Sequence, residues 1–150
     1  MGLLNPDYKD ILSAFSAEKV EYMLVGAYAL AAHGLPRATG DIDLWIRSTP
    51  ENAHRVWGAL AAFGAPLDGL TEEDFLGADV VLQIGVAPCR IDVVTSIDGV
   101  EFEDAWARRI GIEIEGIQVN VIGRDDLIRN KRAAARPQDL ADVARLEGEA

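Results

Sequence analysis

The chain has 150 residues, and its 14 Lys and Arg against 25 Asp and Glu give a formal net charge of -11 at pH 7. This length suffices for one domain with a substantial core, so we expect a single domain over residues 1–150. The charge disfavours a protein that grips extended nucleic acid by neutralising its phosphates. It fits a small cofactor, a small cationic substrate or a protein partner better.

Three features bear on the cellular compartment. The single cysteine, Cys89, excludes an internal disulfide framework and suits a reducing environment. The first seven residues lack the basic region and apolar core of a signal peptide. The longest uncharged, apolar-rich stretch, residues 23–32, is about half as long as a membrane-spanning helix. We therefore expect a cytoplasmic protein with no membrane partner.

Hydrophobic periodicity predicts helices interleaved with strands, which indicates an α/β or α+β sheet domain. The predicted helices cover residues 7–19, 27–33, 101–109, 124–135 and 137–147, and a further helix starts within residues 48–51 and carries an apolar stripe from 56 to 63. The predicted strands cover residues 22–25, 41–46, 80–86, 90–97, 110–114 and 117–121. Residues 64–79 are rich in Gly, Pro and acids, and we expect a loop there with a short helical turn at 71–76.

The last two predicted strands form a hairpin. Ile110, Ile112 and Ile114 alternate with Gly or Glu, and the alternation resumes after the two-residue turn Glu115-Gly116. With this turn Ile114 faces Ile117, Ile112 faces Val119 and Ile110 faces Val121, so that one face is wholly apolar.

Asp41 and Asp43 open a predicted strand whose continuation, Leu44-Trp45-Ile46, is apolar enough for a central place in a sheet. The same acid-x-acid spacing recurs in this acidic chain at Glu72/Asp74, Glu101/Glu103, Glu113/Glu115 and Glu147/Glu149. Those pairs fall on a polar hairpin face or in loop and helix-end sequence, where solvated acids are ordinary. On a strand, residues two apart point to the same face about 6.6 Å apart, a span that two side chains can close around one divalent ion.

A third acid, Asp92, stands inside the apolar strand sequence Arg90-Ile91-Asp92-Val93-Val94. An ionised carboxylate there is costly unless it is paired or coordinates a metal. If this strand lies beside that of Asp41, three carboxylates converge; their repulsion raises at least one pKa, and Mg²⁺ reverses the rise. Two metals bound in this way can activate an attacking hydroxyl and stabilise a leaving pyrophosphate. The alternative is that Asp41 and Asp43 cap or solvate a strand end and that Asp92 pairs with Arg90 or another base.

Gly26 lies between a predicted strand and a predicted helix, where its missing side chain lets a phosphate approach backbone N–H groups. The alternative is a glycine that only makes the turn. Arg37 and Thr39 could reach the same phosphates, although Arg37 could equally be solvated.

Near the end of the chain, five of the 14 basic residues fall within 13 positions, a local cationic surface able to meet a triphosphate or to balance the acid cluster. For most of them, pairing with neighbouring acids is the favoured alternative. Lys131 is the exception, for which we do not favour this pairing. The five residues are Arg124, Arg129, Lys131, Arg132 and Arg136.

The combination of Gly26-Ala27, Asp41-Ile42-Asp43 after a further thirteen residues, and Asp92 on a later strand resembles the nucleotidyltransferase superfamily related to DNA polymerase β and kanamycin nucleotidyltransferase. Residues 125–131 and 136–143 resemble the end of small bacterial members related to the abortive-infection nucleotidyltransferases. The resemblance extends over about residues 20–147. It implies a mixed β-sheet flanked by helices, with a C-terminal helix pair.

By this resemblance, Asp41, Asp43 and Asp92 bind two Mg²⁺ ions, and an NTP is the co-substrate. Asp92 would also be the base for the acceptor hydroxyl. Gly26 would approach the triphosphate, and Lys131 would be a further nucleotide contact.

The implied activity is the transfer of a nucleoside monophosphate to a hydroxyl acceptor: an antibiotic or other small molecule, a protein or an RNA end. Relatives also serve in toxin-antitoxin pairs, so a small helical protein partner or a homodimer is compatible with the resemblance. The rival hypothesis is a catalytically silent nucleotide-binding or partner-binding module. Ala27 supports the rival because many relatives have there a Ser whose hydroxyl contacts phosphate, whereas the intact carboxylates oppose it.

Overall fold

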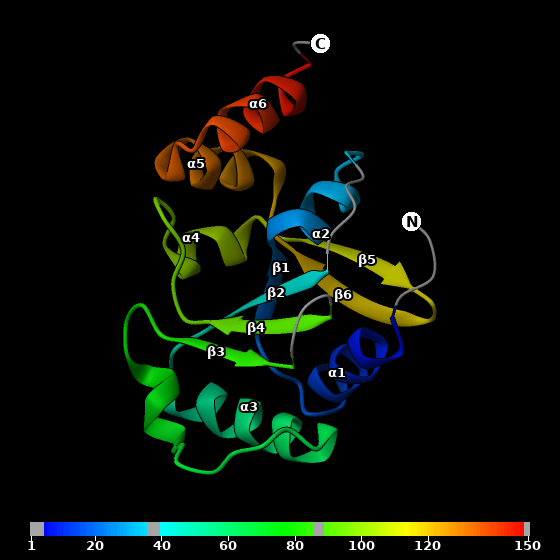
Figure 1. The fold of residues 1–150 in the computed structure, drawn as a ribbon, viewed down its shortest axis with the longest axis vertical. Helices are drawn as coiled ribbons and strands as arrows, with labels where there is room; N and C mark the ends of the chain where they lie inside the picture. Colours follow the sequence, from blue (N-terminus) through cyan, green and yellow to red (C-terminus); the bar gives the residue numbers. More distant parts are fainter. Residues whose placement is uncertain (1–4, 36–39, 86–88, 149–150) are drawn as a thin grey trace.

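A computed structural model describes residues 5–35, 40–85 and 89–148 of the chain. These residues form one six-stranded mixed sheet with helices on both faces (Figure 1). The helices are α1 (Pro6–Ala17), α2 (Gly26–Ala32), α3 (Pro50–Phe63), the 3₁₀ helix η1 (Glu72–Leu76), α4 (Phe102–Ala107), α5 (Arg124–Ala134) and α6 (Pro137–Leu146). The strands are β1 (Tyr22–Val25), β2 (Asp41–Ile46), β3 (Val81–Ile84), β4 (Arg90–Val94), β5 (Ile110–Ile114) and β6 (Ile117–Val121).

The strand order is β3-β4-β2-β1-β6-β5, which places β2 and β1 in the middle of the sheet. β2 pairs antiparallel with β1 and parallel with β4, and β1 pairs parallel with β6. The mixed sheet, the helix pair at the end of the chain and the central place of the strand at 41–46 are thereby confirmed. The pairing of β2 with β4 matters most for the site, because each strand carries part of the acid cluster.

The hairpin of β5 and β6 has the predicted register, with Ile114 opposite Ile117 and Ile112 opposite Val119. Its turn residues both have positive φ, 49° at Glu115 and 83° at Gly116. Two consecutive positive φ values define the type I′ turn that suits the twist of a two-residue hairpin.

The helices form two layers around the sheet. α1 and α3 cover one face, α2 and α4 the other, and the pair α5 and α6 lies beyond α2 and α4 (Figure 1). Trp45 of β2 meets Phe102 of α4 edge to face, with ring centroids 5.0 Å apart. Since residues two apart on a strand share a face, Asp41 and Asp43 also lie on this side of the sheet.

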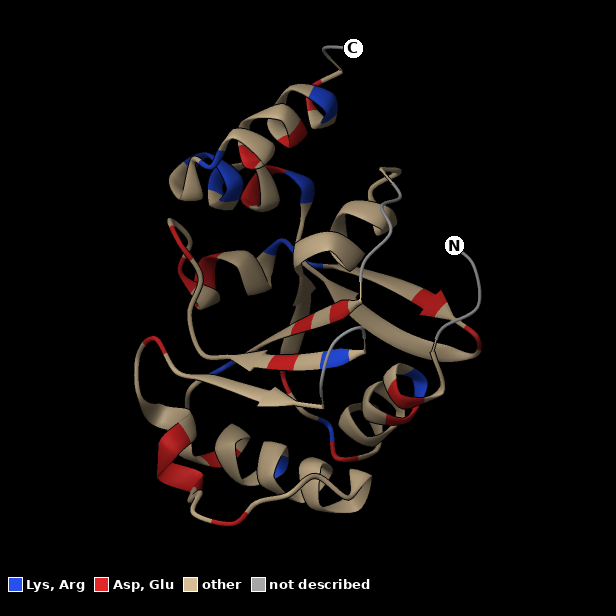
Figure 2. Ribbon diagram, viewed as in Figure 1, with Lys and Arg blue, Asp and Glu red and all other residues tan. Residues whose placement is uncertain are grey.

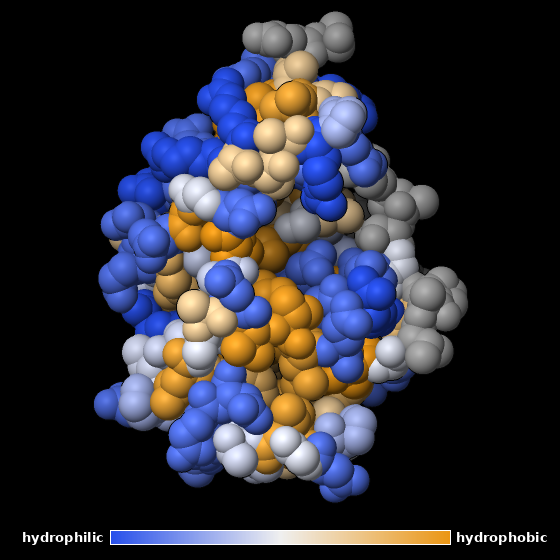
Figure 3. Space-filling model, turned by 60° about the vertical axis from the view of Figure 1, so that its left-hand side comes forward, coloured by the Kyte–Doolittle hydropathy of each residue, from blue (hydrophilic) through white to orange (hydrophobic). Residues whose placement is uncertain are grey.

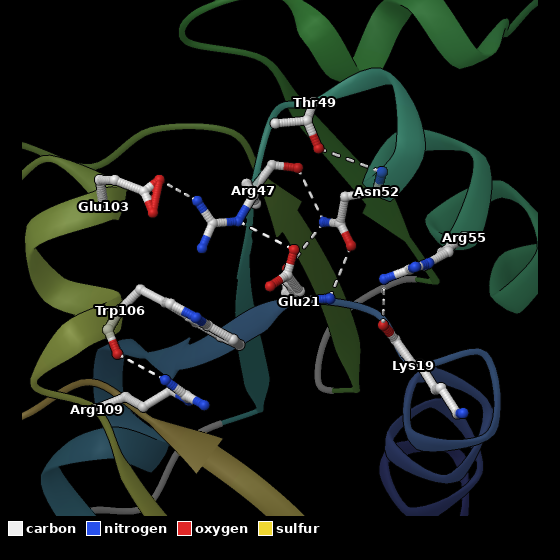
Figure 4. Close-up of polar contacts among 9 residues, drawn as sticks. All are labelled: Lys19, Glu21, Arg47, Thr49, Asn52, Arg55, Glu103, Trp106 and Arg109. Carbon is white, nitrogen blue, oxygen red and sulfur yellow. Dashed lines mark hydrogen bonds and ion pairs between the residues drawn. The ribbon is translucent and has the colours of Figure 1, made fainter.

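The end of β2 is fixed by a buried polar network (Figure 4). Asn52, 1% exposed, accepts from the Glu21 backbone N–H at 2.7 Å and donates to the carbonyls of Glu21 and Arg47, each at 2.9 Å. The Arg47 guanidinium forms ion pairs with Glu21 at 3.1 Å and with Glu103, and it lies over the Trp106 ring at 5.4 Å. These contacts tie β1, β2, α3 and α4 together, which holds the strand that carries Asp41 and Asp43.

Several element ends differ from the predicted ones. The predicted strand 90–97 ends at Val94, because the chain leaves the ladder at Thr95, whose hydroxyl accepts the Val80 N–H at 2.9 Å. The predicted strand 80–86 is observed over Val81–Ile84, and its last predicted residue falls outside the described ranges. No helix in the described part of the chain is both long and apolar enough to cross a bilayer.

Candidate active site

Two neighbouring strands bring the three predicted carboxylates together. Along the parallel pair of β2 and β4, Asp43 lies opposite Asp92 and Asp41 lies opposite Arg90. Residues directly opposite each other share a face, so all four side chains emerge on the side of α2 and α4. Figure 2 shows the acidic bands of the two strands side by side, next to the basic start of β4.

The Asp43 carboxyl lies among other acids in a largely buried place. Burial raises its pKa most, followed by the charge of Asp92, the hydrogen bond between these two side chains and the charge of Asp41. Arg90 opposes the rise, and the resulting pKa is about 7, compared with the ordinary 3.8. Asp43 is therefore partly protonated at neutral pH, and an added cation would lower its pKa.

The guanidinium of Arg90 bridges the acids of the two strands. Its Nη2 donates to Asp41 Oδ2 at 2.9 Å, and its Nε donates to Asp92 Oδ1 at 3.0 Å. Nη2 also donates to Asp92 Oδ2 at 3.3 Å. Asp92 thus lies beside the acids of β2 and pairs with Arg90, which is the pairing that the alternative interpretation expects. Its role as a metal ligand stays a prediction.

Gly26 makes room for Asp43. It has φ +70°, and a Cβ added to it would lie 2.3 Å from Asp43 Oδ2. Only a residue without a side chain allows this approach, because 2.3 Å is far inside the contact distance of carbon and oxygen. The sequence predicts Gly26 as a phosphate contact; the structure adds a reason for this glycine that needs no ligand.

Tyr8 of α1 joins the starts of the two acidic strands, a connection that the sequence analysis missed. Its hydroxyl contacts two carbonyls, those of Gly40 and, at 3.1 Å, Arg90. The Arg90 N–H in turn donates to the Gly40 carbonyl at 2.8 Å. Burial, with the nearby Tyr28 next in importance, raises the pKa of Tyr8, so its hydroxyl keeps its proton as a donor.

The cluster has the donor chemistry of a magnesium site. Mg²⁺ prefers carboxylate oxygens, and Asp41, Asp43 and Asp92 present theirs on one face of adjacent strands. Within residues 5–35, 40–85 and 89–148, no three His, Cys, Asp or Glu side chains are arranged to hold a metal ion. The residue types and the strand register fit the ion. In this structure, however, nitrogens of Arg90 occupy the position beside two of the three carboxylates, those of Asp41 and Asp92.

Lys131 lies in the C-terminal helix pair with its charge already paired. Its Nζ is 2.9 Å from Asp142 Oδ2 and 3.4 Å from Asp139 Oδ1, and its side chain is 9% exposed. Arg136 also pairs with Asp139, at 2.6 Å. The ammonium joins α5 to α6, and a buried, paired cation has little capacity left for a phosphate. The nucleotide contact expected at Lys131 stays a prediction.

The remaining predicted contacts flank the cluster in sequence. Ala27 follows Gly26 in the first turn of α2. Arg37 and Thr39 lie outside the described residues. The sequence gives only weak signals for Arg90 and Tyr8. Arg90 stands two residues before Asp92, and Tyr8 lies on an amphipathic helix, and neither position reveals a contact across strands.

Known proteins similar to this chain include nucleotidyltransferases. The family described as "Nucleotidyltransferase of unknown function (DUF6036)" matches residues 8–147. Among curated proteins, none matches the chain.

Two solved structures are similar in fold. One is a protein of Thermotoga maritima to which a nucleotidyltransferase activity is ascribed, with 14% identity, a TM-score of 0.63, and coverage of 99% of this chain and 97% of that one. The other is the lincosamide antibiotic adenylyltransferase LnuA, solved with lincomycin bound, with 14% identity, a TM-score of 0.63, and coverage of 100% of both chains. At this identity the likeness shows the fold.

Proposed function

Since this chain belongs to a nucleotidyltransferase family over residues 8–147, we propose that it moves a nucleoside monophosphate from an NTP to the hydroxyl group of an acceptor, with Mg²⁺. The observation that carries this proposal is the acid cluster on adjacent parallel strands, where Asp41, Asp43 and Asp92 share one face beside Gly26. Arg90 offsets part of the negative charge of this cluster, and the divalent ion that accompanies an NTP would offset more of it.

The proposed reaction is a displacement at the α-phosphorus. The acceptor oxygen forms a bond to this phosphorus, the bond to the bridging oxygen of the β-phosphate breaks, and pyrophosphate leaves. Asp41, Asp43 and Asp92 would hold two Mg²⁺ ions, which would supply positive charge to the triphosphate and to the leaving pyrophosphate. Asp92 takes the proton of the acceptor hydroxyl.

Backbone and side-chain donors near the acids bind the triphosphate in this proposal. Gly26 and Ala27 offer N–H groups at the turn between β1 and α2, in the first turn of the helix. Arg37 and Thr39 are proposed as further phosphate contacts. The Ala at position 27 provides no hydroxyl, so this turn binds phosphate through the backbone alone.

We propose a small hydroxylated molecule as the acceptor. LnuA is described as a lincosamide antibiotic adenylyltransferase, and the two chains cover each other completely. The net charge of -11 disfavours an RNA end and favours a cationic molecule.

Val94 of β4 and Val81 of β3 offer an apolar surface for part of such a molecule. Figure 3 shows apolar residues gathered near the centre of this side of the protein, with hydrophilic residues around them. Val94 follows Asp92 by two residues on the same face, and its partner across the ladder, Val81, is 55% exposed. An acceptor with its hydroxyl at Asp92 can place an apolar group on Val94 and Val81.

The test is a transfer assay with α-phosphate-labelled ATP, GTP, CTP and UTP, Mg²⁺ and a panel of hydroxylated acceptors that includes lincosamides and aminoglycosides. Protein and RNA acceptors form separate arms. Transfer should occur with wild type and vanish in Asp43→Ala. Asp68→Ala, which removes an equal charge from an exposed loop position, should transfer normally.

Two results would contradict the proposal. Transfer that survives in Asp43→Ala would place the chemistry elsewhere. Nucleotide binding that is unchanged in Asp43→Ala and is never accompanied by transfer to any acceptor would identify a silent binding module.

A further inference from the structure

Arg90 is placed where a metal ion would compete with it. Its guanidinium lies between a carboxylate of β2 and one of β4, with nitrogen to oxygen distances of 2.9 Å to Asp41 and 3.0 Å to Asp92. A cation bound by Asp41 and Asp92 would use the oxygens that now accept hydrogen bonds from Arg90. Both cannot make their full set of contacts at once.

The backbone of Arg90 is fixed, whereas its side chain has access to solvent. The Arg90 N–H donates to the Gly40 carbonyl, and the Tyr8 hydroxyl contacts the Arg90 carbonyl. The side chain is 31% exposed, compared with 10% for Asp92. The guanidinium can therefore leave the acids by rotation of side-chain bonds, without moving the ladder between β2 and β4.

We propose that Arg90 is a built-in counter-ion that closes the acid cluster in the metal-free protein and must release Asp41 and Asp92 before a divalent metal binds. This inference rests on the proposed function, because it takes the cluster as the metal site. The affinity for metal is then the difference between the metal–carboxylate and the guanidinium–carboxylate interactions, so Arg90 lowers it.

Removal of the guanidinium should therefore strengthen metal binding. Arg90→Gln leaves the three carboxylates without their internal cation, and a metal no longer has to displace it. Partly exposed pairs of this kind contribute on the order of 1 kcal/mol, so we expect the Kd for metal to fall about five- to tenfold.

The experiment measures binding of Mn²⁺ alone, from the electron paramagnetic resonance signal of the free ion, in metal-stripped protein. Wild type, Arg90→Gln and Asp43→Asn are compared, with Arg55→Gln as the control. Arg55 is an exposed residue of α3 on the other face of the sheet, and its loss changes the net charge by the same amount. Arg90→Lys is the second variant, because it keeps the charge but cannot bridge two carboxylates bidentately.

Tighter Mn²⁺ binding in Arg90→Gln, intermediate binding in Arg90→Lys and unchanged binding in Arg55→Gln are expected. If Arg90→Gln does not fold, Arg90→Lys alone decides, and a Kd equal to that of wild type overturns the proposal. Equal affinities in Arg90→Gln and Arg55→Gln would also overturn it, while Mn²⁺ binding that depends on Asp43 would leave the proposed function intact. Mn²⁺ binding that is identical in wild type and Asp43→Asn would instead refute the metal site itself.

Discussion

Replacement of Asp43 by Asn should stabilise the metal-free protein at high pH. The pKa of Asp43 in the folded chain is about 7, above the ordinary 3.8. The folded state therefore keeps the Asp43 proton at pH values at which the unfolded chain has lost it. The contribution of this proton to the unfolding free energy is fully present below the ordinary pKa of Asp. It is lost as the pH rises through the pKa that Asp43 has in the folded chain.

The size of this effect follows from the two pKa values. Between pH 5 and pH 8, the wild type should lose about 3 kcal/mol of unfolding free energy through Asp43, since one pKa unit corresponds to about 1.4 kcal/mol. In Asp43→Asn this loss is absent, because the amide does not ionise. Its N–H group can also donate to Asp92, as the protonated carboxyl does.

The assay is urea unfolding of wild type and Asp43→Asn at a series of pH values in the presence of a chelator. The difference between the two proteins at each pH isolates Asp43, since the other titrating groups are common to both. From pH 5 to pH 8, the unfolding free energy of the variant should rise by about 3 kcal/mol relative to that of the wild type. Millimolar Mg²⁺ at pH 8 should stabilise only the wild type. A difference that stays constant with pH would refute the reasoning that burial and neighbouring acids hold this proton.

Three other substitutions test the frame around the acids. Gly26→Ala puts a methyl group against the Asp43 carboxylate and an alanine in a left-handed backbone conformation, which costs about 1–2 kcal/mol of unfolding free energy. The loss of transfer activity, expressed as a free energy, should be larger than this loss of stability. Tyr8→Phe removes the hydroxyl that joins the starts of β2 and β4; it should lower stability by about 1–2 kcal/mol and lower kcat more than it changes the KM for NTP. Lys131→Met leaves Asp139 and Asp142 buried without their shared cation and should cost about 3 kcal/mol. The KM for NTP of the folded Lys131→Met protein should equal that of wild type, and a large increase would show that Lys131 contacts the nucleotide.

Patterns within one segment predicted most of the fold. The hairpin of β5 and β6 follows from alternation about a two-residue turn, and both determinants lie within twelve residues. The strand at Asp41–Ile46 is also predictable, because its apolar end requires burial on both faces. Periodicity and turn chemistry act locally, so a single chain segment reveals them.

The contacts of the site join distant segments, and these were only partly predictable. The sequence shows that Asp92 needs a partner, but not that β4 lies beside β2 with Asp43 opposite Asp92. The bridge from Arg90 to Asp41 spans 49 positions, and the contact of Gly26 with Asp43 depends on the pairing of β1 with β2. Such contacts depend on the register of long-range ladders, which no local pattern specifies.

Lys131 is a second residue whose contacts the local sequence does not reveal. A basic residue in an acidic chain invites assignment to a phosphate, and its sequence neighbours do not show that it is buried. The helix pair brings Asp139 and Asp142 to it from the next helix, where they neutralise its charge. Burial and pairing together, rather than residue type, decide what this cation can bind.

We propose the acids on β2 and β4 as a metal-dependent centre for nucleotide transfer. The most direct test is the release of pyrophosphate from each NTP, coupled to label transfer, in wild type, Asp41→Asn and Asp43→Asn with and without Mg²⁺. We expect stoichiometric pyrophosphate and labelled product with the wild type and Mg²⁺, and neither with the variants or with chelator. Equal product formation by wild type and Asp43→Asn would contradict the account.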